Sequence, residues 1–160
     1  MISTISTLCM LCLALMIQQP STQQNEPQSR FVGKWVGVQT WAIDDAPPDR
    51  QPQPVTLTIE LVDGKLAGTM SPFFGGTDVA YFSGAEIVGD QLSATATVGP
   101  PPATGSTERP PSRGFTANVR VKFDFKSGDR NNMTGTADIF MGDVKWLRFN
   151  YDLGKQRSRY

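Results

Sequence analysis

Apolar and polar residues alternate along most of this chain, and turns that contain glycine interrupt the alternation. The clearest run covers 115–125, and the run 55–62 repeats it. The odd positions of the first run are Phe115, Ala117, Val119, Val121, Phe123 and Phe125, and its even positions are polar. Successive side chains of a strand point to opposite faces, so a period of two predicts strands with one buried face.

Three segments share one longer pattern: an alternating run, a turn with glycine, and then leucine or methionine followed by small residues and threonine. They are 59–69, 85–95 and 123–136. In the first copy the turn is Asp63-Gly64, a pair that readily adopts the positive φ of a tight hairpin. Successive hairpins build an antiparallel meander, whose edges must be closed or covered.

We expect eight strands, over 32–43, 55–62, 65–73, 79–88, 91–98, 115–125, 133–141 and 144–153. No segment has the 3.6-residue period of a helix. A proline-rich acidic segment, 44–54, and a segment with five prolines, 99–114, form the two long connections. The predicted fold class is therefore all-β: a single antiparallel up-and-down β-barrel of about eight strands, with a small sandwich as the alternative. Eight strands enclose packed side chains or one small ligand.

The N-terminal segment differs from the rest of the chain. Residues 8–17 are an apolar run of signal-peptide length, too short to cross a bilayer. We expect a signal peptide over 1–19, a polar disordered spacer over 20–30, the barrel domain over 31–154 and a basic tail over 155–160. The protein is then secreted or periplasmic, with no stable membrane span after processing.

The composition excludes several kinds of chemistry. The chain has no histidine, and its two cysteines, Cys9 and Cys12, lie in the expected signal peptide. A histidine base, a zinc thiolate site and a disulfide are therefore excluded from the mature domain. The carboxylates of Asp44, Asp45 and Asp49 lack a regular ligand spacing, so we interpret them as turn residues. We expect no cofactor, no metal and no enzymatic activity.

The charges are unevenly distributed although their formal sum is zero. Residues 1–108 carry four basic and ten acidic groups, and residues 109–160 carry eleven basic and five acidic groups. The basic half is either a set of outward positions on late strands or a positive face for an acidic partner. The five aspartates in that half favour the first interpretation. A neutral total argues against binding to nucleic acid.

Several motifs resemble those of one superfamily. Gly33-Lys34-Trp35 resembles the opening of calycin-type barrels, the lipocalins and avidins, and the segments 64–70, 114–119, 133–136 and 145–148 are similar to four avidin strand segments. The resemblance implies an eight-stranded barrel with a ligand pocket at one mouth, where Phe115 and Trp146 match aromatic walls. Gly37 and Met70 stand where avidins have asparagine and tyrosine. The resemblance therefore implies an apolar or aromatic pocket, and we do not expect biotin as the ligand.

The candidate ligand-binding residues are Trp35, Trp41, Met70, Phe115 and Trp146. Trp35 has a second interpretation, as a plug at the narrow barrel end beneath a late-strand cation such as Arg148. Trp41 lies nearer the acidic connection and is either a mouth residue or a core aromatic. Trp146 points to one face of the last strand, whereas Leu147 and the other apolar residues of that strand point to the opposite face. Both faces of the last strand are therefore partly apolar. This predicts self-association, a partner contact or packing beneath the long connection.

We therefore expect an exported, non-enzymatic β-barrel that binds a small apolar or aromatic ligand in its interior, with the segments 44–54 and 99–114 at its mouth. The expected partners are this small hydrophobic ligand and further copies of the chain. The alternative is a structural or protein-interaction module with a solid core, working through the outer face of its last strand. A cavity of several hundred Å³ is typical of the first function, and continuous packing of the second.

Overall fold

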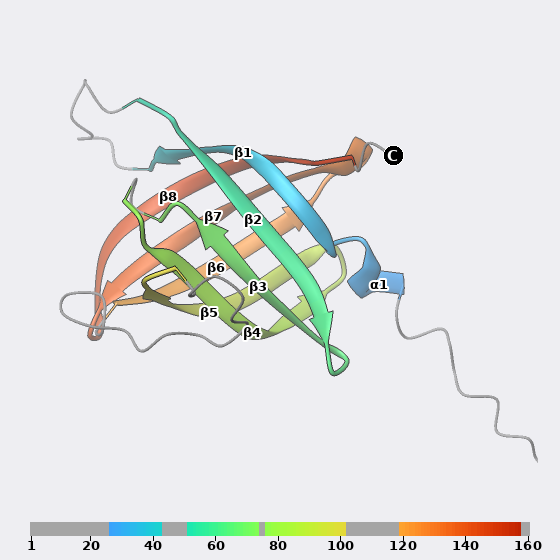
Figure 1. Cartoon of the computed structure of the whole chain (residues 1–160), viewed down its shortest axis with the longest axis horizontal. Coiled ribbons are helices and arrows are strands. Elements are labelled where there is room, and N and C mark those ends of the chain that lie inside the picture. Colours follow the sequence, from blue (N-terminus) through green and yellow to red (C-terminus); the bar gives the residue numbers. More distant parts are fainter. Residues whose placement is uncertain (1–25, 43–50, 74–75, 102–118, 158–160) are drawn as a thin grey trace, which may run out of the picture.

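The computed structural model describes residues 26–42, 51–73, 76–101 and 119–157. Over these ranges the chain forms a closed barrel of eight antiparallel strands, preceded by a short helix (Figure 1). The elements are α1 (Glu26–Ser29), β1 (Gly33–Trp41), β2 (Gln53–Val62), β3 (Lys65–Ser71), β4 (Val79–Val88), β5 (Gln91–Gly99), β6 (Val119–Ser127), the 3-10 turn η3 (Asp129–Asn131), β7 (Asn132–Met141) and β8 (Val144–Lys155).

Every strand pairs with the next one along the chain, and β8 returns to pair with β1. On the two sides of β1, Trp35 lies opposite Leu57 of β2 and Gly37 lies opposite Leu153 of β8. Closure removes the unpaired strand edges that would otherwise template aggregation. The predicted all-β up-and-down barrel is confirmed.

Tight turns join the strands where the sequence predicts them. Asp63 and Gly64 connect β2 to β3 with φ values of 50° and 75°, as the hairpin interpretation requires. Gly89, in the turn from β4 to β5, has a φ of 62°. Two of the three hairpins of the repeated pattern are thereby confirmed, and in the third β6 pairs with β7 across the 3-10 turn η3.

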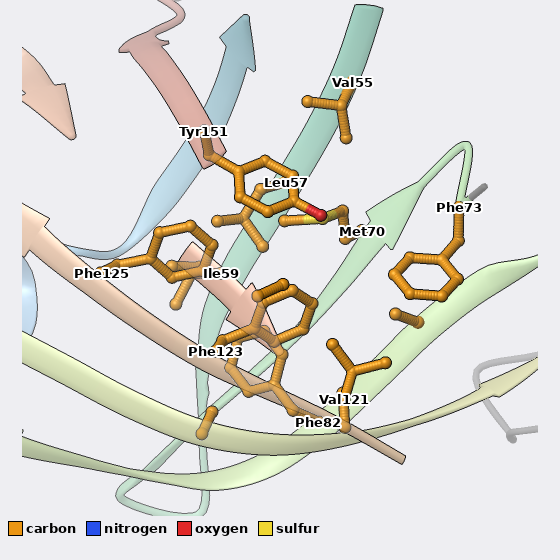
Figure 2. Close-up of a cluster of buried hydrophobic side chains, with 14 of the residues drawn as sticks. Val55, Leu57, Ile59, Met70, Phe73, Phe82, Val121, Phe123, Phe125 and Tyr151 are labelled. Atoms are coloured by element: carbon orange, nitrogen blue, oxygen red, sulfur yellow. The ribbon is translucent and has the colours of Figure 1, made fainter. Parts of the chain in front are cut away.

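Large apolar side chains fill the barrel from the inner faces of the strands. Figure 2 shows Phe82, Phe123, Phe125 and Tyr151 gathered with Leu57 and other aliphatic residues. The rings of Phe123 and Phe125 stack with centroids 5.4 Å apart, and Tyr151 meets Phe125 edge-on at 5.7 Å. Small residues make room for these rings, since a Cβ at Gly68 would lie 2.5 Å from Cζ of Phe82. The core thus has the dense large-against-small packing of protein interiors.

The N-terminal boundary differs from the expected one. Residues 26–29 of the predicted disordered spacer form α1, and the Phe31 amide donates a hydrogen bond to the Gln28 carbonyl at 3.1 Å. Lys155, predicted to begin the tail, belongs to β8, and its Nζ donates to the Arg30 carbonyl at 3.2 Å. The reason is Phe31, whose ring is fully buried in the core and therefore holds the preceding turn against the barrel.

Strand boundaries differ from the expected ones by up to two residues where the structure describes both. For the sixth strand the described part begins at Val119, so the predicted start at 115–118 lies outside the described residues. In β4 the register shifts between Phe82 and Glu86, where Gly84 has a φ of 71°. This bulge reverses the parity of the inward residues of β4, from Ala80 and Phe82 before it to Ala85 and Ile87 after it.

Candidate functional site

Aromatic side chains close the end of the barrel beside α1. Trp35 is 1% exposed, and its indole Nε1 donates a hydrogen bond to the Phe31 carbonyl at 2.8 Å. The Nζ of Lys155 lies 5.2 Å from the centre of the indole ring, a cation–π distance. Trp35 therefore occupies the position of the plug. A late-strand cation therefore covers Trp35 as predicted, but it is Lys155 of β8. Arg148, the example named for this role, lies on the outer face of β8 and pairs there with Asp138.

The opposite end, here called the far end, is formed by Trp41 of β1, Gln53 of β2, Gly99 of β5 and Val119 of β6. Trp41 is half-buried and lies directly opposite Phe149 of β8. Their rings meet edge-on with centroids 4.7 Å apart, a favourable aromatic arrangement. Trp41 thus places an indole ring, packed against Phe149, at the far end. The two long connections that we expected at the mouth, 43–50 and 102–118, lie outside the described residues.

A row of three polar side chains crosses the inner face just below Trp41. Gln39 of β1 lies opposite Gln53 of β2 on one side and opposite Tyr151 of β8 on the other. Gln39 Nε2 donates to Gln53 Oε1 at 2.8 Å, and the Tyr151 hydroxyl donates to Gln39 Oε1 at 3.3 Å. Gln39 and Tyr151 are both fully buried, with exposed fractions of 1% and 3%. We call these three residues the polar row.

Burial raises the pKa of the Tyr151 hydroxyl well above its usual value, because the phenolate would lose its hydration inside the barrel. The hydroxyl therefore keeps its proton at neutral pH and remains a hydrogen-bond donor. The row combines amides, a phenol and a neighbouring indole ring. Such groups bind and orient a ligand; none of them is an activated nucleophile.

The other predicted site residues are dispersed. Met70 is fully buried in the core cluster (Figure 2), and Phe115 lies outside the described residues, as do Asp44, Asp45 and Asp49. Gly37, where the resembled family has asparagine, packs its Cα against the backbone of β8, so that a Cβ would lie 2.9 Å from the Cα of Leu153. The position therefore cannot hold a side chain without moving β8.

Trp146 lies on the outer face of β8 and is 48% exposed, whereas Phe149, Tyr151 and Leu153 point inward. The predicted two-faced apolar character of the last strand is confirmed. A groove of about 200 Å³ lies nearby on the outer face of β5, β6 and β7. Its lining consists of Thr95, Arg120, Val121, Lys122 and Phe140.

Aspartates of the same outer face neutralise many of its cations. Arg120 pairs with Asp143 at 2.8 Å, and Lys122 pairs with Asp124 at 3.4 Å. Lys145 Nζ lies 2.8 Å from the Asp138 carboxylate. Arg148 donates two hydrogen bonds to the same carboxylate, and the one from its Nη2 is 2.7 Å long. The described part of the basic half thus consists largely of outward ion pairs, which favours the first interpretation of its charge.

Asp138→Asn is expected to lower the free energy of unfolding by about 1 kcal/mol at neutral pH. Arg148 and Lys145 lower the pKa of Asp138 from 3.8 to about 2, and its side chain is only 15% exposed. The contribution is reduced by solvent screening, because both cations are more than 40% exposed. A depressed folded-state pKa stabilises the protein above pH 4, and this stabilisation is lost as the pH falls towards 2.

The measurement is urea unfolding of both proteins between pH 2 and 7. The difference between them should be constant above pH 5 and fall to a small fraction of that value at pH 2, and 1 M salt should reduce it at neutral pH. A difference as large at pH 2 as at pH 7 would mean that the substitution acts through packing and not through the charge of Asp138.

Sequence reasoning missed the polar row, although it identified Trp41 beside it. Gln39 has the same parity as Trp35 and Trp41, and this parity placed it on the buried face of the first strand. A glutamine at an inward position is the signal that could have revealed it. Its partner Tyr151 is 112 residues away, so no local pattern connects the two.

Neither a family model nor a curated sequence matches this chain. The described residues contain no group of three or more carboxylate or thiol side chains placed to hold a metal ion. No helix within those residues is long and apolar enough to cross a membrane. The candidate site therefore rests on the geometry of the far end alone.

Proposed function

We propose that this chain is a non-enzymatic binding barrel that holds a small apolar or aromatic ligand at its far end. The observation that supports the proposal is a half-buried indole, Trp41, placed beside the buried amide of Gln39. An aromatic surface combined with a few oriented polar groups is typical of small-molecule sites. A polar group buried in an apolar core also costs stability, so its retention favours a functional role.

The ligand lies at the far end in this proposal and does not run along the barrel axis. Phe31 and Trp35 occupy the end beside α1, and Phe82, Phe123 and Phe125 fill the middle. These side chains have almost no exposed surface, so the proposal places the ligand above them, at the level of Trp41. Met70 and Trp35 then act as core residues beneath the site.

Three further expectations belong to the same proposal. Because the chain has no histidine, binding is a better supported activity than acid–base catalysis. The apolar run at 8–17 supports export to the periplasm or the cell exterior. The closed barrel and the Gly33-Lys34-Trp35 opening of β1 support a calycin-type origin close to avidins or lipocalins.

Native mass spectrometry of the protein purified from its own host tests the proposal. We expect wild type to retain a small molecule, and Trp41→Ala to lose it, because the indole supplies most of the apolar contact. Trp146→Ala is the matched control, since it removes the same side chain from the outer face and should keep the ligand. A clean apo mass with a fixed subunit number would contradict this proposal.

The outer face carries a second candidate function. Trp146 is half-exposed on β8, and the groove beside Phe140 and Arg120 faces the same side of the barrel. Exposed aromatic and arginine side chains are enriched at protein interfaces. A partner protein or a second copy of the chain would bind here, and Trp146→Ala would then reduce association while Trp41→Ala would not.

A further inference from the structure

The hydrogen bonds of the polar row have a fixed direction. The Tyr151 hydroxyl is buried and carries a single hydrogen, which it donates to Gln39 Oε1. A reversed row would leave this hydrogen without that acceptor, at a cost comparable to that of a buried unsatisfied donor. The oxygen of Gln39 therefore faces Tyr151, and its nitrogen faces Gln53.

The direction continues into the third member of the row. Gln39 Nε2 donates to Gln53 Oε1 at 2.8 Å, so the oxygen of Gln53 is turned towards Gln39. The Nε2 of Gln53 is then turned away from Gln39, because the oxygen and the nitrogen diverge from the same amide carbon. Gln53 is the first residue of β2 and is partly exposed at the far end. The row thus presents hydrogen-bond donors there.

Trp41 lies beside these donors. Gln53 is opposite Gln39, and Trp41 is two residues further along the same face of β1, which makes Trp41 and Gln53 diagonal neighbours across the strand pair. An acceptor atom held by Gln53 would therefore belong to a molecule whose body can lie against the indole ring. The Tyr151 phenol, at the other end of the row, fixes the direction of these donors without touching the ligand.

We propose that the far end selects flat apolar molecules that carry a hydrogen-bond acceptor, such as a carbonyl or carboxylate oxygen, and discriminates against the same molecules without one. The acceptor bonds to Gln53 Nε2, and the apolar body lies on Trp41. Tyr151 is a positioning residue, because it fixes the direction of the row through Gln39. This inference rests on the proposed function and specifies its ligand class.

Two probes of the same shape test the inference on the intact protein. 2-Acetylnaphthalene carries a carbonyl where 2-isopropenylnaphthalene carries a methylene group. Binding is measured for both from the chemical shift changes of the tryptophan indole N–H resonances. We expect the ketone to bind about threefold to tenfold more tightly, the value of one net hydrogen bond.

Three variants separate the role of the row from that of its surroundings. Gln53→Glu keeps an oxygen towards Gln39 and replaces the outward donors with an oxygen, so the ketone should lose its advantage. Gln51→Glu places the same charge on an exposed residue outside β2 and should preserve the preference. Tyr151→Phe removes the donor that fixes the direction of the row, so the preference should fall although Tyr151 does not contact the probe.

The outcomes are distinguishable. If neither probe binds, the proposed function and this inference both fail. If both bind equally to wild type, or the alkene binds better, the site remains but its donor character is wrong. If Tyr151→Phe keeps the full preference while Gln53→Glu abolishes it, the positioning role of Tyr151 is overturned. The comparison of probes on wild type requires no variant to fold.

Discussion

Trp35→Ala is expected to lower the free energy of unfolding by about 3–5 kcal/mol, the range for a large aromatic side chain removed from a core. Trp35 is 1% exposed, and it packs at the end of the barrel where Phe31 is also fully buried. The substitution also leaves the Phe31 carbonyl without its 2.8 Å hydrogen bond and removes the ring beneath Lys155. Urea unfolding followed by far-ultraviolet circular dichroism measures the loss.

The chain supplies its own control for this prediction. Trp146→Ala removes the same number of atoms from a side chain that is 48% exposed on the outer face of β8. Its expected cost is less than about 1 kcal/mol, as for most surface substitutions. Equal losses from the two variants would show that the end beside α1 is not closed by packing on Trp35.

The strands and their buried faces could be predicted because the signal is local. Alternation in 119–125 identifies Val119, Val121, Phe123 and Phe125 as inward residues, and all four are fully buried. The turn at Asp63-Gly64 follows from the conformational freedom of those two residues. These features depend on the spacing of a few neighbours, so a single sequence is sufficient to reveal them.

Other features depend on which strands meet, and the sequence does not contain that information locally. Lys155 was predicted to lie in a tail, yet it covers Trp35, because closure of β8 on β1 brings residues from the two ends of the domain together. Residues 26–29 were expected to be disordered because they are polar, yet the burial of Phe31 holds them in place. Tertiary contacts decided both cases against local composition.

The candidate site could be predicted from the sequence only in part. The position of Trp41 at one end of the first strand follows from sequence, whereas the polar row requires the register of both neighbouring strands. Gln39 was overlooked because glutamine is usually exposed, although its parity with Trp35 and Trp41 points to the buried face. Its burial and its bonds to Gln53 and Tyr151 become visible only once the barrel is closed.

Register also explains why position 37, where the resembled avidins have asparagine, has no side chain. Gly37 lies opposite Leu153, and a Cβ built on it would overlap the backbone carbonyl oxygen of Asp152 and lie 2.9 Å from the Cα of Leu153. The obstructing atoms are backbone, so no side-chain rotation relieves the contact. The absence of a side chain at position 37 is therefore a condition for pairing β1 with β8 at this spacing.

Gly37→Ala is accordingly expected to destabilise the barrel by about 3 kcal/mol, at the upper end of the usual range for overpacking, because β8 itself must move. This loss exceeds the 0.4–1 kcal/mol or so that alanine gains over glycine through a less flexible unfolded chain. Gly37→Asn should lose at least as much and should create no polar site. Urea unfolding measures both losses, provided that the slope of the unfolding free energy against urea concentration is the same as in wild type.

Gly154→Ala, in the adjacent strand, is the matched control. A Cβ there would lie 3.9 Å from the Val36 carbonyl oxygen, an ordinary contact, so the free energy of unfolding should change by less than about 1 kcal/mol. A Gly37→Ala protein as stable as wild type would mean that β1 and β8 can separate at no cost. The row from Gln53 through Gln39 to Tyr151 crosses the same strand pair two residues away, so it could not then hold a fixed direction.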